Sequence, residues 1–270
     1  MLKFDCCFLT DVGKIRNNNE DNFFLNGNYK RAPWDLSYTK YDLIYRGGLF
    51  AVCDGMGGEE YGERASLIAV ETLKEYRDMN FNESINKYIN EANEKICDLI
   101  NENNGTRSGT TLALIYIQEG IVYTYNVGDS RIYLFRRGRL KQISKDHTRA
   151  EQMVDMGILT KEQAASHRDR HIVTQHLGIF PEELIIEAYK SEQFEVANND
   201  VLLICSDGLT DMVSDEEIQT VMQTNDSANG IANELMNKAL NKGGKDNVTV
   251  GIIKTISPKE GFFNRLWRKQ

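Results

Sequence analysis

Several aspartates in this sequence stand next to glycine at the end of an apolar run. LFAVCDG contains Asp54, YTYNVGD ends on Asp129, LLICSDG contains Asp207, and Asp246 precedes the last apolar run. Aspartate is uncommon within strands, and glycine lets a ligand or another backbone approach closely. A single Asp-Gly pair of this kind is usually a turn. Four acids in such positions indicate instead that they share one site.

A cluster of acids needs positive charge. Two carboxylates roughly 4 Å apart repel by about 4 kcal/mol at an effective dielectric constant of about 20, so several together require protons or bound cations. The candidate ligands are all carboxylate oxygens, with no His or Cys interleaved, which favours Mg²⁺, Mn²⁺ or Ca²⁺ over Zn²⁺ or Cu²⁺. The spacing of an EF-hand loop is absent. The sequence therefore predicts a divalent-metal site built from aspartates.

Arg16 precedes the acidic pair Glu20 and Asp21 in a polar stretch. The planar guanidinium group of arginine binds two oxygens of a phosphate at once. An arginine beside a divalent-metal cluster therefore suits a substrate that carries phosphate. The alternative for Arg16 is a solvated surface side chain without such a role.

The apolar pattern also predicts the elements that must position these residues. Apolar residues recur at helical spacing over residues 61–77, 82–103, 216–222 and 231–240. Strand-like runs cover residues 2–10, 49–53, 110–117, 121–127, 131–135, 140–143, 184–189, 201–205 and 248–253. Glycine turns between the runs of residues 110–143 predict an antiparallel meander. Strand runs mixed with helix pairs indicate an α+β fold with antiparallel sheets.

Composition limits the classes of protein. The chain has 270 residues, 41% of them hydrophobic, and a formal net charge of −8; a global field of this sign repels nucleic acid and anionic lipid. Five cysteines without a CxxC pair predict reduced core thiols in a reducing compartment. The N-terminal apolar run is broken by Asp5 and is no signal peptide, and no stretch is long enough to span a bilayer. We expect a cytoplasmic protein.

Short motifs along the chain occur in an order that resembles a known family. They are Arg16-Asn17-Asn18-Asn19-Glu20-Asp21, Asp54-Gly55-Met56-Gly57-Gly58, Gly62-Glu63, Ser108-Gly109-Thr110-Thr111, Val127-Gly128-Asp129-Ser130-Arg131, Ser206-Asp207-Gly208-Leu209 and Asp246-Asn247. Over about residues 2–254 the chain resembles the type 2C, metal-dependent protein phosphatases, the PPM family. The run Asp-Gly-Met-Gly-Gly is typical of the bacterial branch.

The resemblance implies a fold and its parts. The expected fold is a four-layer α-β-β-α sandwich, in which two central antiparallel sheets are flanked by helix pairs. Residues 1–256 would form the catalytic domain, with a flap at residues 146–180, and a basic, aromatic tail would occupy residues 257–270. All four histidines fall within the flap, which argues against a histidine metal site; they are His147, His167, His171 and His176.

The resemblance also assigns roles to the acids. Asp54 would bridge two Mn²⁺ or Mg²⁺ ions, with the Gly55 carbonyl as a further ligand. Asp207 and Asp246 would be the other direct ligands. Together with Arg16, which would bind the substrate phosphate, Asp54, Asp207 and Asp246 are the predicted catalytic residues.

Further acids would complete the metal centre. Glu20 and Asp21 would bind the ions directly or through water. Asp129, with Asp207 and Asp211, matches a third and weaker metal site of the family, for which Asp211 has the required spacing of four residues after Asp207.

The expected reaction is the hydrolysis of phosphoserine and phosphothreonine by a metal-activated water. The partners would be phosphorylated proteins and a cognate Ser/Thr kinase whose action the enzyme opposes, with no nucleic acid. Two alternatives stay open: a catalytically weak module on the same fold that binds phosphoproteins or partners, and a Ca²⁺-binding structural protein. The tail is either a plain chain end or a weak contact to a membrane surface or a partner.

Two features depart from the family pattern. Some members carry a histidine, a candidate general acid, beside the Asp-Gly pair, where this chain has Met56, so the proton donor is unassigned. The interval between Asp21 and Asp54 is also longer than we expect, and includes Trp34, Tyr38 and Tyr41. It is either an extended hairpin or a docking surface, since exposed aromatic side chains favour interfaces.

Overall fold

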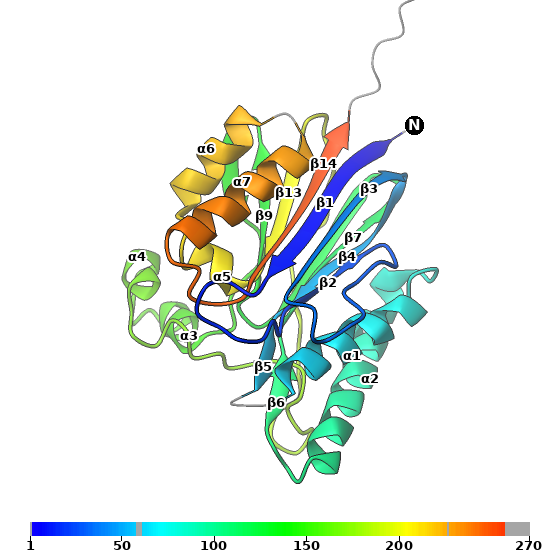
Figure 1. Cartoon of the computed structure of the whole chain (residues 1–270), viewed down its shortest axis with the longest axis vertical. Coiled ribbons are helices and arrows are strands. Elements are labelled where there is room, and N and C mark those ends of the chain that lie inside the picture. Colours follow the sequence, from blue (N-terminus) through cyan, green and yellow to red (C-terminus); the bar gives the residue numbers. More distant parts are fainter. Residues whose placement is uncertain (1, 58–60, 226, 257–270) are drawn as a thin grey trace, which may run out of the picture.

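The computed structural model describes residues 2–57, 61–225 and 227–256. Its first sheet is antiparallel and has the strand order β10-β9-β13-β14-β1-β3. These strands are β10 (Arg139–Gln142), β9 (Arg131–Arg136), β13 (Val201–Cys205), β14 (Val248–Ile256), β1 (Lys3–Asp11) and β3 (Ser37–Tyr45). The first and last long strands of the described chain, β1 and β14, therefore lie side by side in this sheet (Figure 1).

The second sheet is also antiparallel, with the order β11-β8-β7-β4-β2, and β12 pairs with β8 as well. Its strands are β11 (Tyr189–Lys190), β8 (Ile121–Val127), β7 (Leu112–Gln118), β4 (Gly47–Cys53), β2 (Asn22–Leu25) and β12 (Phe194–Glu195). A small separate sheet joins β5 (Gly55–Gly57) to β6 (Ser108–Thr110).

Helices cover the outer face of each sheet. The second sheet carries α1 (Gly62–Glu75) and α2 (Phe81–Glu102), and the first carries α6 (Asp215–Thr224) and α7 (Ala228–Asn241). Figure 1 shows the resulting layers, which confirm the expected four-layer α-β-β-α sandwich. Three short helices lie outside these layers: α3 (Arg149–Asp155), α4 (Lys161–Ala165) and α5 (Asp207–Thr210).

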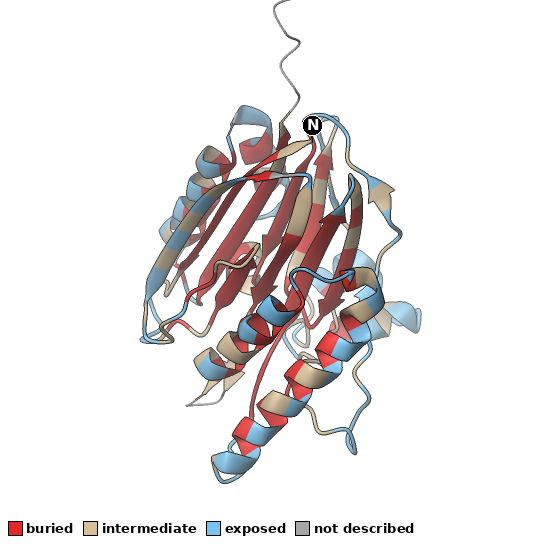
Figure 2. Cartoon of the chain, turned by 90° about the vertical axis from the view of Figure 1, so that its right-hand side faces the viewer, coloured by how far each residue is buried: buried red, intermediate tan, exposed pale blue. Residues whose placement is uncertain are grey.

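The core has three parts, because each sheet is buried on both faces. One part packs α1 and α2 on the second sheet, another packs α6 and α7 on the first, and the third fills the space between the sheets. Figure 2 shows the strands almost wholly buried. Between the sheets, the Phe8 ring of β1 lies 5.5 Å from Phe23 of β2 and 6.2 Å from Phe50 of β4, measured between ring centroids. These contacts hold the two sheets together.

The predicted meander is wrong in its connection. β7 and β8 form a hairpin in the second sheet, but β9 and β10 form theirs in the first. The chain changes sheets at Gly128-Asp129-Ser130, which had the local signature of a tight turn. The predicted run 110–117 is also divided at Thr111 into β6 and β7. Turn residues alone do not reveal which sheet the next strand joins.

The expected strand over residues 184–189 is wrong as well. Only Tyr189 and Lys190 pair with β8, and Ile185 is 77% exposed. An apolar run of this length becomes a strand only where a sheet edge is available along it, and here it lies against α2 instead.

The long interval between Asp21 and Asp54 forms an edge strand and not a hairpin. β3 pairs with β1 over nine residues, from Ser37 opposite Asp11 to Tyr45 opposite Lys3. The chain then crosses to β4 in the other sheet through Arg46 and Gly47, both with positive φ. A Cβ at Gly47 would lie 2.1 Å from the Ile117 carbonyl oxygen, so this crossing requires glycine.

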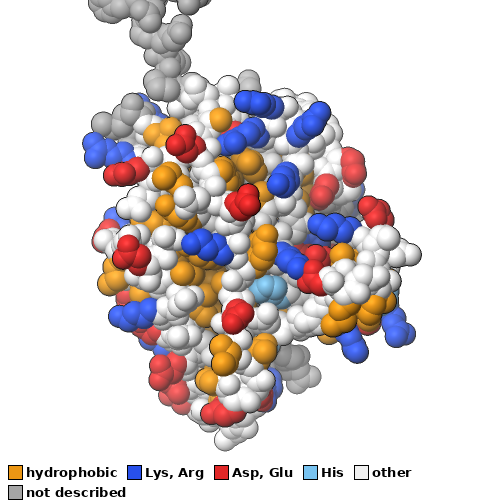
Figure 3. All heavy atoms as spheres, turned by 180° about the vertical axis from the view of Figure 1, so that it is seen from behind, with side chains coloured by type: hydrophobic (Ala, Val, Ile, Leu, Met, Phe, Trp, Pro, Cys, Tyr) orange, Lys and Arg blue, Asp and Glu red, His pale blue; other side chains and the backbone are white. Residues whose placement is uncertain are grey.

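The described surface shows no segregation of charge on the face seen in Figure 3. Acidic and basic side chains are both spread over the face opposite to that of Figure 1 (Figure 3). Among the described helices, none combines the length and the apolar character needed to cross a lipid bilayer. The tail proposed for residues 257–270 lies outside the described residues.

Candidate metal centre

Loops at one end of the sandwich bring the predicted acids together. Asp54 follows β4, Asp207 opens α5 directly after β13, and Asp246 precedes β14. Burial raises the pKa of Asp54 well above its ordinary value, and the charges of Asp21, Asp207, Asp129 and Asp246 raise it further. The acids therefore lie within electrostatic reach of one another, although among the described residues only His171, Asp207 and Asp211 offer three ligand atoms within 4.8 Å of one another.

Asp207 lies where both predicted sites meet. Burial raises its pKa well above the usual range, followed by the charges of Asp129, Asp211, Asp246 and Asp21. A Cβ at Gly208 would lie 2.0 Å from the Asn247 carbonyl oxygen. Glycine is therefore needed after Asp207 so that α5 can approach the loop that carries Asp246.

Asp21 is fully buried just before β2. Its Oδ2 accepts hydrogen bonds from Ser206 Oγ and Thr249 Oγ1, each at 2.7 Å. Its other oxygen, Oδ1, is buried without a hydrogen-bond donor. A buried carboxylate oxygen without a partner is costly, and a cation would satisfy it. This atom is the clearest sign that the acids fit a metal ion.

The backbone around Asp54 is fixed by Thr111. The Asp54 N–H donates to Thr111 Oγ1 at 3.0 Å, and the Thr111 N–H donates to the Asp54 carbonyl at 2.9 Å. Thr111 Oγ1 also lies 2.7 Å from Ser130 Oγ, next to Asp129. The residue that divides β6 from β7 thus links two acids of the cluster.

Gly55 and Glu20 lie against each other. A Cβ at Gly55 would lie 2.5 Å from the Glu20 carbonyl oxygen and 2.3 Å from that of Gly62. Burial and the neighbouring Glu63 raise the pKa of Glu20 to about 7. Glu20 is thus a partly buried acid at the rim of the same cluster.

Asn247 ties the N-terminal loop to the site. Its Oδ1 accepts from the Glu20 N–H at 2.8 Å, and its Nδ2 donates to the carbonyls of Val12 and Asn18 at 3.0 and 2.8 Å. Arg16, in the same loop, places Nη2 2.7 Å from Asp246 Oδ2, and its side chain is 56% exposed. The structure therefore brings Arg16 to the cluster and leaves part of its guanidinium group open to solvent.

Asp129 lies at the crossing between the sheets. Burial, with Asp146 as the next cause, raises its pKa to about 7. The preceding Gly128 has φ +99°, and a Cβ there would lie 2.7 Å from the Thr111 side chain. This glycine allows the chain to cross close to Asp54.

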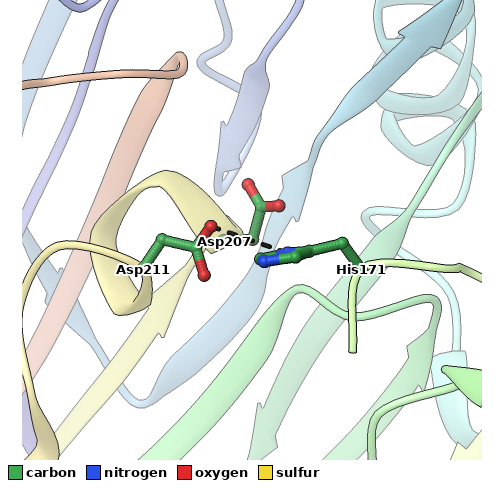
Figure 4. Close-up of side chains that lie close together, drawn as sticks. All are labelled: His171, Asp207 and Asp211. Carbon is green, nitrogen blue, oxygen red and sulfur yellow. Dashed lines mark ion pairs between the residues drawn. The ribbon is translucent and has the colours of Figure 1, made fainter. Parts of the chain in front are cut away.

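The segment predicted to be a flap, residues 146–180, reaches the proposed third site through His171 and Arg170. His171, Asp207 and Asp211 offer ligand atoms within 4.8 Å of one another (Figure 4). His171 Nδ1 lies 3.6 Å from Asp211 Oδ2, and Arg170 Nη2 lies 3.4 Å from Asp211 Oδ1. The sequence analysis did not include His171 in the site, and nothing in the sequence distinguishes it from the other three histidines.

The remaining histidines have other contacts. His147 Nδ1 accepts from the Gly128 N–H at 3.3 Å, and His167 Nδ1 accepts from the Asp169 N–H at 3.2 Å. His176 packs on Gly109, where a Cβ would lie 2.4 Å from its Nδ1. Gly109 in turn pairs with Met56 in the small sheet. Met56 occupies the position where some family members carry a histidine, and its thioether cannot act as a general acid.

Lys30 is a second residue that the sequence analysis missed. It lies in the long interval, is fully buried, and donates from Nζ to the Asn19 carbonyl at 2.6 Å. Burial lowers its pKa to about 8, and the Asp21 carboxylate opposes this change. Lys30 therefore carries a positive charge at neutral pH that interacts with the acids through space, while its direct contact is the Asn19 carbonyl.

The comparisons with known proteins agree with this geometry. A family model described as protein phosphatase 2C matches residues 43–242. The serine/threonine phosphatase stp of Listeria welshimeri is 33% identical over 265 residues, which cover 94% of this chain and 97% of the relative.

Solved structures give the same result. The serine/threonine phosphatase PstP/Ppp of Mycobacterium tuberculosis superimposes with a TM-score of 0.79 at 30% identity, covering 95% of this chain and 100% of that one. A PstP catalytic domain, solved in complex with two manganese ions, has a TM-score of 0.77 at 29% identity, covering 95% and 100%. The chain belongs to the protein phosphatase 2C family of metal-dependent phosphatases.

Proposed function

We propose that this chain is a metal-dependent phosphoprotein phosphatase that hydrolyses phosphoserine and phosphothreonine. The observation that carries the proposal is the group of mutually repelling, wholly or partly buried acids, in which Asp21 Oδ1 has no hydrogen-bond donor. These acids offer only hard oxygen ligands, which Mn²⁺ and Mg²⁺ prefer. The two manganese ions of the related PstP structure support the same assignment.

The chain would hold the ions with groups already described. Asp54, the Gly55 carbonyl, Asp207 and Asp246 are the proposed direct ligands of two ions, and Glu20 and Asp21 would bind directly or through water. Asp129, Asp207 and Asp211 would hold a third. When bound, such ions acidify a water molecule and neutralise the charge that develops on the phosphoryl group.

Arg16 is the proposed phosphate-binding group. One nitrogen of its guanidinium group is held by Asp246, while arginine has five N–H donors in all. Its other N–H donors have no ion-pair partner among the described residues and can bind a phosphate brought by a protein substrate, because the side chain is 56% exposed. Asp246 thereby orients Arg16 toward the acids that hold the ions.

The broader assignments follow from this function. Residues 1–256 form the catalytic domain, with residues 146–180 as a flap that shapes access to the site. The substrates are phosphorylated proteins, and the enzyme reverses the action of a Ser/Thr kinase. Five free, buried cysteines suit the reducing conditions of the cytoplasm. The basic and aromatic residues 257–270 would contribute a weak contact to a membrane surface or a partner.

Hydrolysis assays test the proposal directly. We expect release of phosphate from p-nitrophenyl phosphate and from a phosphothreonine peptide in Mn²⁺, and none in EDTA. Asp54→Asn should remove the activity, whereas Asp98→Asn, at an exposed position of α2, should leave it unchanged. An inactive wild-type protein that still binds phosphopeptides would contradict the proposal and favour a regulatory binding module.

A further inference from the structure

Lys30 is the only buried lysine or arginine within the described ranges of the chain. Its backbone N–H donates to Asn22 Oδ1 at 3.0 Å, and its carbonyl accepts from Asn22 Nδ2 at 2.9 Å. Its ammonium group donates to the Asn19 carbonyl. Burying a charged ammonium group is costly unless opposite charge lies close by. The position of Lys30 is thus tightly fixed, and its charge needs a partner.

The acids that interact with Lys30 include two of the proposed metal centre. Burial lowers the pKa of Lys30; among the acids that raise it again, Asp21 has the largest effect, followed by Asp35, Glu63 and Glu20. Hydrogen bonds through Asn19 also connect Lys30 to Asp21. The Lys30 ammonium group donates to the Asn19 carbonyl, and the Asp21 N–H donates to Asn19 Oδ1 at 3.1 Å. Lys30 therefore stabilises the loop that carries Glu20 and Asp21 through its hydrogen bond to Asn19.

We propose that Lys30 is a positioning residue of the metal centre: its buried ammonium group is a built-in counter-charge for Asp21 and Glu20 that stabilises the metal-free loop and weakens its attraction for divalent ions. This inference rests on the proposed metal site. A fixed positive charge beside carboxylates favours their ionised form and opposes a second cation by ordinary electrostatic repulsion. The same residue thus stabilises the metal-free protein and lowers its affinity for divalent ions.

The loop has supports that do not depend on Lys30. Asn247 holds the Glu20 N–H, and Asn19 Nδ2 donates to Thr10 Oγ1 and to the Leu36 carbonyl, both at 3.0 Å. Neutralising Lys30 should therefore remove its charge without releasing the loop. The electrostatic effect on metal affinity is then the dominant one.

Two substitutions separate charge from shape. Lys30→Met keeps the length of the side chain and removes its charge, and Lys30→Gln removes the charge but keeps an N–H donor. At pH 7 we expect both variants to melt at a lower temperature than wild type in EDTA. Titration calorimetry on chelator-treated protein should give Mn²⁺ binding about tenfold tighter than wild type, equivalent to about 1.4 kcal/mol. Mn²⁺ should consequently raise their melting temperatures more than that of wild type.

Lys95→Met is the matched control, since Lys95 pairs with Glu91 on the surface of α2; its Mn²⁺ affinity should equal that of wild type. Unchanged or weaker Mn²⁺ binding by Lys30→Gln would overturn the inference, and this variant decides the question if Lys30→Met does not fold. A wild-type protein that binds no Mn²⁺ would contradict the proposed function instead.

Discussion

At the scale of single residues, the candidate site is defined by acids in an unfavourable state. Asp54 and Asp207 lie in surroundings that raise their pKa values, because their carboxyl groups are partly shielded from water and because other carboxylates are near them. Carboxylates in such surroundings are typical of functional sites, where a bound ligand offsets the free energy of their mutual repulsion. The missing hydrogen-bond donor at Asp21 Oδ1 supports a cation as that ligand.

Asp207→Asn tests this interpretation with two opposite effects. Hydrolysis in Mn²⁺ should fall at least roughly 100-fold, since loss even of groups that only support metal ligands costs about 10- to 100-fold. In EDTA, however, the variant should be more stable than wild type, because one of the repelling charges is gone. Thermal unfolding in EDTA and in Mn²⁺ measures the second effect.

Asp78→Asn provides the comparison for Asp207→Asn, because the Asp78 side chain is 90% exposed. It should change neither the activity nor the stability of the metal-free protein. If Asp207→Asn destabilised the protein in EDTA, the aspartate would be held by favourable contacts, and the view of a repelling cluster would be wrong.

At the scale of elements, β3 changes the meaning of the long interval between Asp21 and Asp54. Tyr38 of β3 points into the space between the sheets, where its ring centroid lies 5.5 Å from that of Phe23, while Tyr41 is 55% exposed. Alternate residues of a strand point to opposite faces. The segment is thus part of the sandwich, and Tyr41 and the 77% exposed Trp34 remain as surface residues for the predicted docking role.

Alanine substitutions in β3 distinguish packing from surface positions. Tyr38→Ala should lower the free energy of unfolding by about 2 kcal/mol, since it removes part of an aromatic core. Tyr41→Ala should change it by less than about 0.5 kcal/mol. Urea unfolding of both variants gives the comparison, and equal effects would mean that β3 does not pack as an integral strand.

The proposed flap, residues 146–180, is the second element with a specific test. At its base the His147 N–H donates to the Gly128 carbonyl and the Thr174 N–H to the His147 carbonyl, whereas its outer part meets the body at Asp211 through Arg170 and His171. Arg170→Ala should speed amide hydrogen exchange in residues 148–165 by about twofold to fivefold, the range expected for one exposed ion pair.

Arg168→Ala is the control for the flap experiment, since Arg168 is 89% exposed and its ion pair among the described residues is with Asp169, inside the same segment. Its exchange rates should match those of wild type. If the Arg170 and Arg168 variants exchanged at the same rate in metal-free protein, the contact with Asp211 would not hold the flap.

At the scale of the whole molecule, the acids make stability depend on pH. Glu20 and Asp129 have pKa values raised to about 7, so the native state binds more protons than the unfolded chain from their ordinary values up to about pH 8. The free energy of unfolding must then fall as the pH rises through that range. Bound cations replace the protons, so Mn²⁺ should reduce the fall.

Thermal unfolding between pH 6.5 and pH 8 measures this effect. In EDTA the melting temperature should drop by at least about 2 °C, which corresponds to roughly 1 kcal/mol for a chain of this size. Below pH 6.5 the half-buried His147 and His176, whose pKa values desolvation lowers, would oppose the trend. A melting temperature that rises over this interval in EDTA would contradict the prediction, and Glu20→Gln with Asp129→Asn should flatten the curve.

Much of the fold was predictable because its signals are local. The helical spacing of Ala65, Ala69 and Leu73 corresponds to the buried face of α1, and the apolar runs before Asp54 and Asp207 are β4 and β13. Which sheet receives a strand was not predictable at Asp129 or at Gly47, where the chain crosses between sheets. Such a choice depends on the packing of the whole sandwich.

The sequence by itself determined the chemistry: carboxylate ligands without histidine or cysteine among them, an arginine for phosphate, and the family. These follow from residue types and their order along the chain. Only the tertiary structure decided that Asp21 is buried with one oxygen lacking a hydrogen-bond donor, that the Lys30 ammonium group binds the carbonyl of the nearby Asn19, and that His171 contacts Asp211. Burial and charge compensation depend on contacts between distant segments, and no local pattern encodes them.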